Sequence, residues 1–466
     1  MRIVLVSLVA LGFFGAGQAG STVGAAQAAP FLGEWTVTAA SAAFGAQTFR
    51  LVVARSGDAV HATIRPANQP EIAITDVRAS GGSLVLSYAA SYPGMSIPTV
   101  LILTPETAGG ATGTLRADMS IMDGQLEMTG SATKGSAAAS PPRPAGGAQA
   151  GGGRGGPPPQ PQVARVTDLM QMMAALPDAA PAKPKQPRRV LVLARAAGFV
   201  HSSIPLAART VEALGQKTGA WTTVISYSAA DITTDNLKQY DAVFLSNTTG
   251  LFLDDPSDAA ATKARRDALL EFVRGGKGLA AVHAATDSYH GAAGPPAPPQ
   301  ANGPVDGGSP LWPDFNRLIG GFFKWHWLYP TQIAVKIDDP ESPINMPFTY
   351  VNQGSGVRLP RPFTIADEVY TFNETSWSRA NAHVLTSIDY TKMPAEVRAL
   401  EPAPRRSDAD YALSYIRREG SGRVFVEVLG HDESIYKQPP MLAHILAGLQ
   451  YALGDLAAND APSRQP

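Results

Sequence analysis

Four histidines of this sequence stand where an imidazole can take part in chemistry. His201, His283 and His431 each come shortly after an apolar run, and His326 ends the segment Phe323-Lys324-Trp325-His326. Imidazoles are the usual general acids and bases near neutral pH, and they are common metal ligands. Because the chain has no cysteine, a Cys nucleophile, thiolate metal ligands and disulfides are all excluded.

Two acidic residues and a polar triplet add to these imidazoles. Asp367 and Glu368 are adjacent, and neighbouring side chains on an extended segment point to opposite faces, so at most one of them is expected to enter a site. The triplet Asn247-Thr248-Thr249 either binds substrate hydroxyls or satisfies the backbone of a turn. The histidines expected to be structural or exposed are His290, His383 and His444.

These residues allow two kinds of chemistry. The candidates for acid–base catalysis are His201, His283, Asp367 and Glu368. The candidates for holding a divalent metal, zinc or a similar ion acting as a Lewis acid, are His283, His326 and His431. The histidines have no H-E-x-x-H spacing, so both alternatives stay open.

The elements that must position these groups alternate between strand and helix patterns. From residue 188 onward, short apolar runs typical of buried strands are separated by helical stretches, as at Val190–Ala194 and Ser203–Lys217. This alternation predicts an α/β fold, a parallel sheet with helices on both faces. Ligands bind at the carboxyl ends of such strands, where the segments with His201, Asn247 and His283 converge.

The chain before residue 188 has a different character. Short strand patterns separated by Gly, Asn, Ser and Pro turns predict a small antiparallel β barrel or sandwich. Its opening, Gly33-Glu34-Trp35, resembles the start of small lipocalin-like barrels. The predicted organisation is a signal peptide at 1–28, the β domain at 30–135, a mobile Gly/Pro-rich linker at 136–187, the α/β domain at 188–456 and a disordered tail at 457–466.

Composition and the N-terminus limit the partners and the compartment. With 38 basic and 39 acidic residues, the net charge gives no general attraction for nucleic acid. One arginine, an apolar run and the site Ala26-Gln27-Ala28 form a signal-peptide pattern, with a second cleavage site at Gly17-Gln18-Ala19. The run is too short for a membrane anchor, and no later stretch predicts a membrane span. We therefore expect an exported protein, periplasmic or secreted.

Six ordered motifs between about Arg189 and Leu456 resemble the ThuA-like family, named for trehalose utilisation. They are G-F-x-H-S-S at Gly198–Ser203, N-T-T-G at Asn247–Gly250, G-G-x-G-L-x-x-V-H-A-A at Gly275–Ala285, F-x-W-H at Phe323–His326, D-E-x-Y at Asp367–Tyr370 and G-R-V-F…L-G-H at Gly422–His431. The resemblance implies a flavodoxin-like fold of the class I glutamine amidotransferase superfamily. His283 stands near the place of the nucleophilic cysteine of those amidotransferases, so glutamine hydrolysis by that route is excluded.

The resemblance also implies a small-molecule carbohydrate substrate. ThuA-like proteins are associated with disaccharide breakdown through 3-keto sugars, whose acidic proton beside the carbonyl suits a base and an electrophile. The expected substrate-binding residues are Asn247, Thr248, Thr249, Tyr370 and Trp325. The alternatives are a carbohydrate-binding protein without catalysis and an interaction module.

Overall fold

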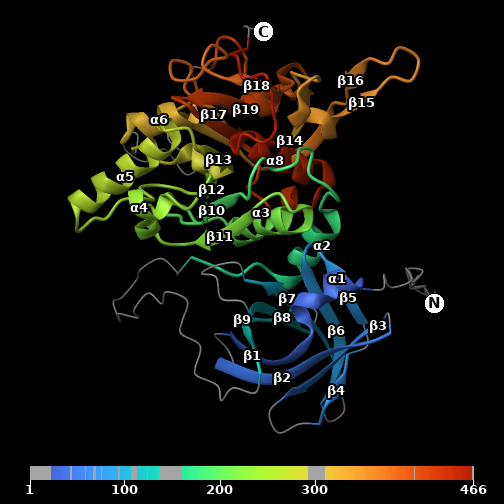
Figure 1. Cartoon of the computed structure of the whole chain (residues 1–466). Coiled ribbons are helices and arrows are strands. Elements are labelled where there is room, and N and C mark those ends of the chain that lie inside the picture. The colour runs from blue at the N-terminus through green and yellow to red at the C-terminus, as the bar shows by residue number, and fades with distance from the viewer. Residues whose placement is uncertain are drawn as a thin grey trace, which may run out of the picture.

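The computed structural model describes residues 23–463, apart from 42–44, 58, 67–69, 75, 93–94, 107–112, 123, 136–159, 292–309 and 404. Most of the predicted signal peptide and the first half of the predicted linker lie outside the described residues. The chain forms two large sheets, and in Figure 1 the N-terminal sheet lies below the second one. Within the described part, no helix is long and apolar enough to cross a membrane.

The N-terminal sheet is antiparallel and curled, and we call it the β domain. Its nine strands follow the order β4-β3-β2-β1-β9-β8-β7-β6-β5, and the sheet curls until β3 and β4 approach β5 and β6. The strands are β1 (Gly33–Ser41), β2 (Gly45–Ser56), β3 (Ala59–Pro66), β4 (Ile72–Ala73), β5 (Asp76–Ser80), β6 (Ser83–Tyr92), β7 (Met95–Pro105), β8 (Thr114–Ile121) and β9 (Leu126–Lys134). Alternate residues face the core, as Trp35, Val37 and Ala39 do on β1. This arrangement agrees with the predicted antiparallel β domain.

The second sheet is mixed, and it differs from the parallel sheet that we expected. Its order is β11-β10-β12-β13-β20-β19-β18-β14-β17. The strands are β10 (Arg189–Leu193), β11 (Thr222–Ser226), β12 (Ala242–Ser246), β13 (Gly278–Val282), β14 (Phe323–Ile337), β17 (Phe363–Phe372), β18 (His383–Ile388), β19 (Ala412–Glu419) and β20 (Gly422–Glu427). The pairs from β11 to β20 are parallel, and the pairs from β20 to β17 are antiparallel. Late strands such as β19 and β20 are joined by a tight turn, so they pair antiparallel without a crossover helix.

Helices cover both faces of this sheet, as predicted. Val190 and Val192 of β10 pack with one set of helices, and Leu191 and Leu193 pack with the other. The first set is α2 (Val166–Ala175), α3 (Ile204–Thr218) and α8 (Pro439–Ala452). The second is α4 (Thr234–Leu237), α5 (Ala259–Arg274) and α6 (Pro313–Ile319). Shorter elements are α1 (Ala25–Ala28), α7 (Ala395–Arg398) and the hairpin β15 (Thr349–Val351) and β16 (Arg358–Pro360), which projects outward in Figure 1.

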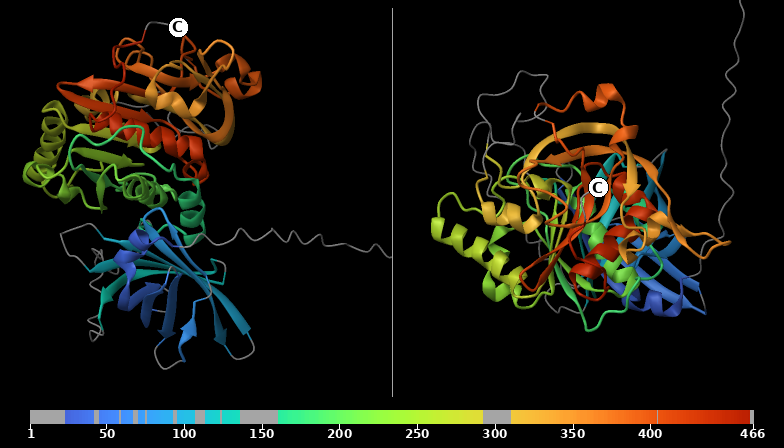
Figure 2. Two further views of the ribbon diagram at one scale, coloured as in Figure 1. Left: turned by 45° about the vertical axis from the view of Figure 1, so that its right-hand side comes forward. Right: turned by 90° about the horizontal axis from the view of Figure 1, so that it is seen from above.

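Two segments that composition predicted to be mobile are packed. In the second half of the predicted linker, α2 lies between the β domain and α3 (Figure 2). It buries Val166, Leu169 and Met173 there. These apolar residues lie on one helical face, and their burial overrides the loop-like composition of the surrounding segment. The predicted disordered tail also differs: the backbone N–H of Ser463 donates to Ala382 O at 3.0 Å, beside β18.

The β domain contacts the α/β domain through a buried charge network. Arg209 of α3 reaches Asp118 of β8 at 2.6 Å and Thr104 of β7 at 3.0 Å. It also pairs with Glu212 at 2.9 Å, and Arg116 reaches the same carboxylate at 2.8 Å. Because every charge here has a partner, the network is satisfied only when the two domains are in contact.

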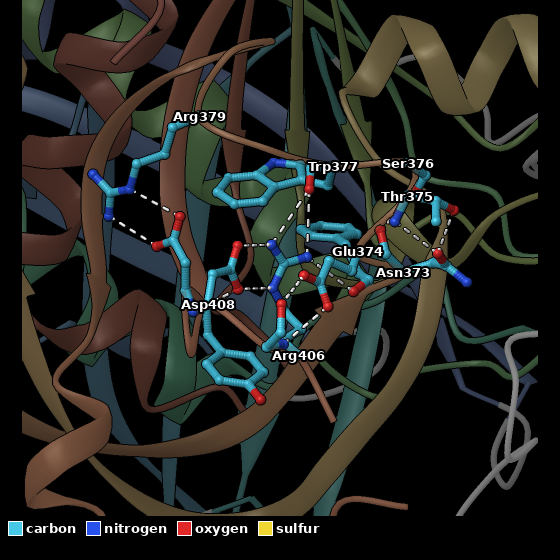
Figure 3. Close-up of polar contacts among 12 residues, drawn as sticks. Asn373, Glu374, Thr375, Ser376, Trp377, Arg379, Arg406 and Asp408 are labelled. Carbon is cyan, nitrogen blue, oxygen red and sulfur yellow. Dashed lines mark hydrogen bonds and ion pairs between the residues drawn. The ribbon is translucent and has the colours of Figure 1, made fainter. Parts of the chain in front are cut away.

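A second buried arginine fixes the end of β17. Arg406 is 6% exposed, its guanidinium lies 5.3 Å from the Trp377 ring centroid, and it pairs with Asp408 at 2.7 Å (Figure 3). It also donates to Phe372 O, the last residue of β17, at 3.4 Å. Asn373 N donates to Phe322 O at 2.8 Å, which ties this end of β17 to the start of β14. The two strands are therefore held firmly where they lead into the site described below.

Replacing Arg209 tests the contact between the domains. Arg209→Met leaves Asp118 and Glu212 with fewer partners in a buried interface, and we expect unfolding free energy to fall by about 3 kcal/mol. The matched control is Lys238→Met, which removes an exposed pair with Asp235 and is expected to leave the unfolding free energy almost unchanged. Urea unfolding of both variants measures the difference, and equal losses would contradict the packed interface.

His383 makes the docking of the C-terminal segment pH-dependent. Its Nδ1 lies 2.8 Å from Ala461 O and its Nε2 lies 2.8 Å from Asp339 Oδ2, and both partners are acceptors. Only the protonated imidazole donates from both nitrogens, and the hydrogen bond with Asp339 raises the pKa of His383 above 6.5. The stabilisation is therefore complete below the unfolded pKa and is lost as pH rises through the folded pKa.

We expect this effect to be visible against His383→Gln, which does not titrate. The difference in unfolding free energy between wild type and variant should be larger at about pH 5.5 than at about pH 8.5, by about 1 kcal/mol in favour of the wild type. Urea unfolding across that range measures the difference. A constant difference between the two proteins would show that His383 does not carry a proton in the folded state.

Candidate metal and acid–base site

Four imidazoles and one carboxylate converge at the carboxyl edge of the parallel strands. His201 lies between β10 and α3, His283 directly follows β13, and His431 comes four residues after β20. Glu368 on β17 and His326 on β14 enter from the antiparallel part of the sheet. The structure thus brings together five of the predicted site residues, and we call them the histidine–Glu368 cluster.

Glu368 lies at the centre of this cluster. Its Oε2 is 3.0 Å from His431 Nδ1, 3.2 Å from His283 Nε2 and 3.8 Å from His201 Nε2. Its Oε1 is 2.8 Å from His326 Nδ1. The carboxylate is 5% exposed, so its charge depends on these neighbours rather than on water.

The orientation of His283 is fixed by the backbone around it. Its φ is +45°, a left-handed conformation that is rare for a residue with a side chain and that often marks a functional turn. Nδ1 lies 2.9 Å from Val428 O, and because that oxygen only accepts, Nδ1 carries the hydrogen and Nε2 of the neutral ring presents a lone pair. Nε2 is buried and, within the described residues, has no hydrogen-bond partner.

Burial and the surrounding groups shift the pKa values of His283 and Glu368 so that one ring is neutral and one carboxylate is ionised. Burial lowers the pKa of His283 to about 4, which favours the neutral ring. Burial alone would raise the pKa of Glu368, but the four surrounding imidazoles outweigh it and hold that pKa well below its usual range. A neutral His283 therefore turns its lone pair toward an ionised oxygen 3.2 Å away, an arrangement that needs a positive charge between the two atoms.

The donor set suits a divalent metal ion. Ligand atoms of His201, His283, Glu368 and His431 all lie within 4.8 Å of one another. Zinc–nitrogen bonds are about 2.1 Å long, so two donors of a tetrahedral ion stand about 3.4 Å apart. Glu368 Oε2 lies 3.0 to 3.8 Å from the nitrogens of His431, His283 and His201, which is close to that spacing. This group differs from the predicted ligand set, because it includes His201 and Glu368 while His326 faces the other carboxylate oxygen.

Comparison with known proteins identifies the family to which the α/β domain is related. The sequence profile of ThuA, described as trehalose utilisation, matches residues 189–295 and 302–452, which is more than half of the chain. The chain belongs to the ThuA family. This result confirms the resemblance seen in the six motifs. A search of curated proteins finds no significant match.

Solved structures include several similar chains. A ThuA-like protein from Bacteroides uniformis shares 17% identity at a TM-score of 0.41, over 59% of this chain and 96% of that one. A cytoplasmic protein from Salmonella typhimurium shares 11% identity at a TM-score of 0.34, over 57% of this chain and 99% of that one. A beta-galactosidase from Bacillus circulans shares 11% identity at a TM-score of 0.30, over 62% and 33% of the two chains.

In this ThuA-family chain, Asp367 has a different role from its neighbour Glu368. Its Oδ2 accepts from Gly430 N at 2.6 Å and from His431 N at 3.4 Å, so it holds the loop that presents the His431 ring. Burial raises the pKa of Asp367 to about 7, although the hydrogen bond from Gly430 N partly opposes this. Only Glu368 joins the imidazoles, as the alternation of side chains on a strand predicts.

The polar triplet after β12 mainly connects loops. Asn247 Nδ2 donates to Ser203 Oγ at 2.9 Å and to Gly430 O at 3.2 Å. Thr249 Oγ1 donates to Phe199 O at 2.7 Å, while Thr248 Oγ1 lies 3.2 Å from Ser288 Oγ. All three triplet residues are buried, so their contacts join the site loops to one another, and their substrate-binding role stays a prediction.

The two aromatic residues of the predicted site are also buried. The Tyr370 ring lies 4.4 Å from that of His283 and 5.5 Å from that of His326, and burial with the nearby carboxylates raises its pKa. Trp325 is 3% exposed and packs against Trp327 at 5.2 Å. The Tyr370 ring therefore packs against the cluster, whereas Trp325 lies in the core that α3 and α8 share. That either residue binds substrate stays a prediction.

Sequence reasoning missed the residues around the accessible edge. The His326 and His431 side chains are 18% and 25% exposed, whereas His201 and His283 are nearly fully buried. The aromatic rings of Phe199 and Tyr329 contact this cluster and remain exposed. The position of Phe199 inside G-F-x-H-S-S was a usable indication, but nothing in the sequence marked Tyr329.

Substitution of Asp367 tests the support of the His431 loop. Asp367→Ala leaves the buried Gly430 N–H without its acceptor, and we expect a loss of about 2 kcal/mol of unfolding free energy. Asp367→Asn keeps an accepting oxygen and matches the protonated carboxyl, so it should cost less than about 1 kcal/mol. Urea unfolding at neutral pH compares the two, and equal stability of the alanine variant and wild type would contradict the anchoring role.

Proposed function

We propose that this chain is an exported enzyme that acts on a carbohydrate, a keto-sugar or disaccharide derivative, with a divalent metal held by the histidine–Glu368 cluster. The observation that carries the proposal is the approach of His283 Nε2 to Glu368 Oε2 at 3.2 Å, in a buried site where both atoms are acceptors. The ligands would be His201, His283, Glu368 and His431, a nitrogen and oxygen set that zinc and similar ions accept.

The substrate class is inferred from the family. Its profile is described as trehalose utilisation, and keto derivatives of such sugars have an acidic proton beside a carbonyl. When bound, the metal would supply Lewis acidity at the carbonyl oxygen. His326 lies outside the ligand set and is partly exposed, so it is the imidazole placed to accept the proton. Asp367 and Gly430 keep His431 in place during this transfer.

The order β11-β10-β12-β13-β20 supports a flavodoxin-like core for the parallel half of the sheet. In such sheets ligands bind at the carboxyl edge near the point where the strand order reverses, which here is β10. The loop after β10 carries His201, and the loops after β12 and β13 carry Asn247 and His283. The cluster therefore stands where this type of sheet binds its ligands.

Export is proposed from the N-terminal pattern. Of the two cleavage sites, the one after Ala19 fits better, because Val23 and Ala28 are buried in the core of the β domain. Cleavage after Ala28 would remove α1, including the buried Ala28.

Metal content and turnover test the proposed function together. The protein is purified without chelators or a histidine tag, as wild type, as His283→Ala and as His61→Ala, which changes an exposed histidine of the β domain. We expect about one ion per chain in wild type and in His61→Ala. His283→Ala removes a direct ligand, so its metal affinity should fall by more than the roughly 10–100-fold that follows when a residue behind a ligand is changed. Elemental analysis gives the ratio.

The same proteins are then incubated with 3-keto glycosides. Wild type and His61→Ala should convert them, and His283→Ala should not. Conversion at the wild-type rate by His283→Ala would remove this residue from the chemistry. Saturable binding with the sugar recovered unchanged would instead identify a carbohydrate-binding protein.

A further inference from the structure

A bulge in β14 places three residues opposite Glu368. In the pairing of β14 with β17, Trp327 faces Val369 and the next pair is Thr331 with Asp367. Residues 328–330 therefore stand against Glu368 alone, outside the regular ladder. Extra residues of this kind re-aim side chains, and they occur often beside active sites.

The bulge directs Tyr329 onto the accessible edge of the cluster. Its ring is stacked on His431 with a centroid distance of 5.6 Å and an interplanar angle of 19°. One face of the ring thus covers the imidazole, yet the residue is 41% exposed. An exposed aromatic face beside a polar site offers a surface on which the apolar face of a ligand can pack.

Phe199 is a second exposed ring beside the same cluster. It is 68% exposed and contacts His201 edge-on at a centroid distance of 4.8 Å. The ring centroids of His201 and His431 lie 4.9 Å apart, so Phe199 and Tyr329, which we call the aromatic rim, contact neighbouring imidazoles of the cluster. The loop that carries Phe199 is fixed by Thr249, which accepts from Gly198 N and donates to Phe199 O.

A sugar ring matches the chemistry of this rim. Pyranose rings have an apolar face of C–H groups that packs on an aromatic face, and hydroxyls around the edge that need polar partners. The hydroxyl at the edge of the exposed Tyr329 ring supplies such a partner. A purely apolar ligand would leave this hydroxyl unused.

We propose that Tyr329, together with Phe199, binds a second sugar ring, so that the substrate is a glycoside of two rings with one ring at the cluster. This inference rests on the proposed function and names its substrate class. The ring that reacts reaches the imidazoles of His326 and His431, and the other ring packs on Tyr329. Recognition of the outer ring is then separate from the groups that hold the metal.

The test compares ligands of two sizes on the metal-loaded, full-length protein. The probes are the 3-keto derivative of a glucose disaccharide and methyl 3-keto-glucoside, which has one ring and the same type of bond, and the readout is the ratio of their kcat/KM values. In Tyr329→Ala we expect this ratio to fall by about tenfold, through a higher KM for the disaccharide. Tyr329→Phe keeps the aromatic face and should restore the ratio to within about threefold of wild type.

Tyr350→Ala is the matched control. Tyr350 is also 41% exposed, but it lies on the β15–β16 hairpin, so its removal should leave the ratio unchanged. An unchanged ratio in Tyr329→Ala, or equal losses for both probes, would overturn the second-ring site while leaving the proposed function intact. A wild-type protein that converts neither probe would overturn both.

Discussion

The buried carboxylate of Glu368 is the constraint on which the site depends. An ionised carboxylate out of water is costly unless positive charge and hydrogen-bond donors replace its hydration. Here four imidazoles surround it, but His283 gives its one hydrogen to Val428 O and turns a lone pair inward. The cluster is therefore complete only with an added cation, whether a metal ion or protons shared among the imidazoles. The surrounding structure holds these groups close despite that cost.

The mixed sheet brings the imidazoles and the carboxylate together from its two halves. The parallel strands end in loops, and these supply the imidazoles of His201, His283 and His431. The carboxylate comes instead from the middle of β17, an antiparallel strand that pairs with β14 on either side of Glu368, at Asp367 and Val369. Arg406 and the contacts of Phe372 hold the far end of that strand. A loop carboxylate could move away from the imidazoles, whereas Glu368 on a paired strand is held in place.

The sequence allowed much of the site to be predicted, because local patterns place residues at strand ends. His201 and His283 follow apolar runs that are buried strands, and the period of two on β17 separates Glu368 from Asp367. The antiparallel half of the sheet, the packed α2 and the exposed Tyr329 could not be predicted in this way. Each depends on pairing between distant segments: the β14 bulge exists only in register with β17, and α2 becomes a buried helix only between two domains.

The contact between the domains reaches the site through α3. This helix begins three residues after His201, and Ser203 at its start donates to Gly430 O, beside His431. Further along α3, Arg209 pairs with Asp118 of the β domain. A shift of the β domain would therefore pull on the helix that sets the positions of two cluster histidines. This argues that the β domain stabilises the geometry of the site, in addition to any binding of its own, and that the Arg209 network and the cluster form one cooperative structure.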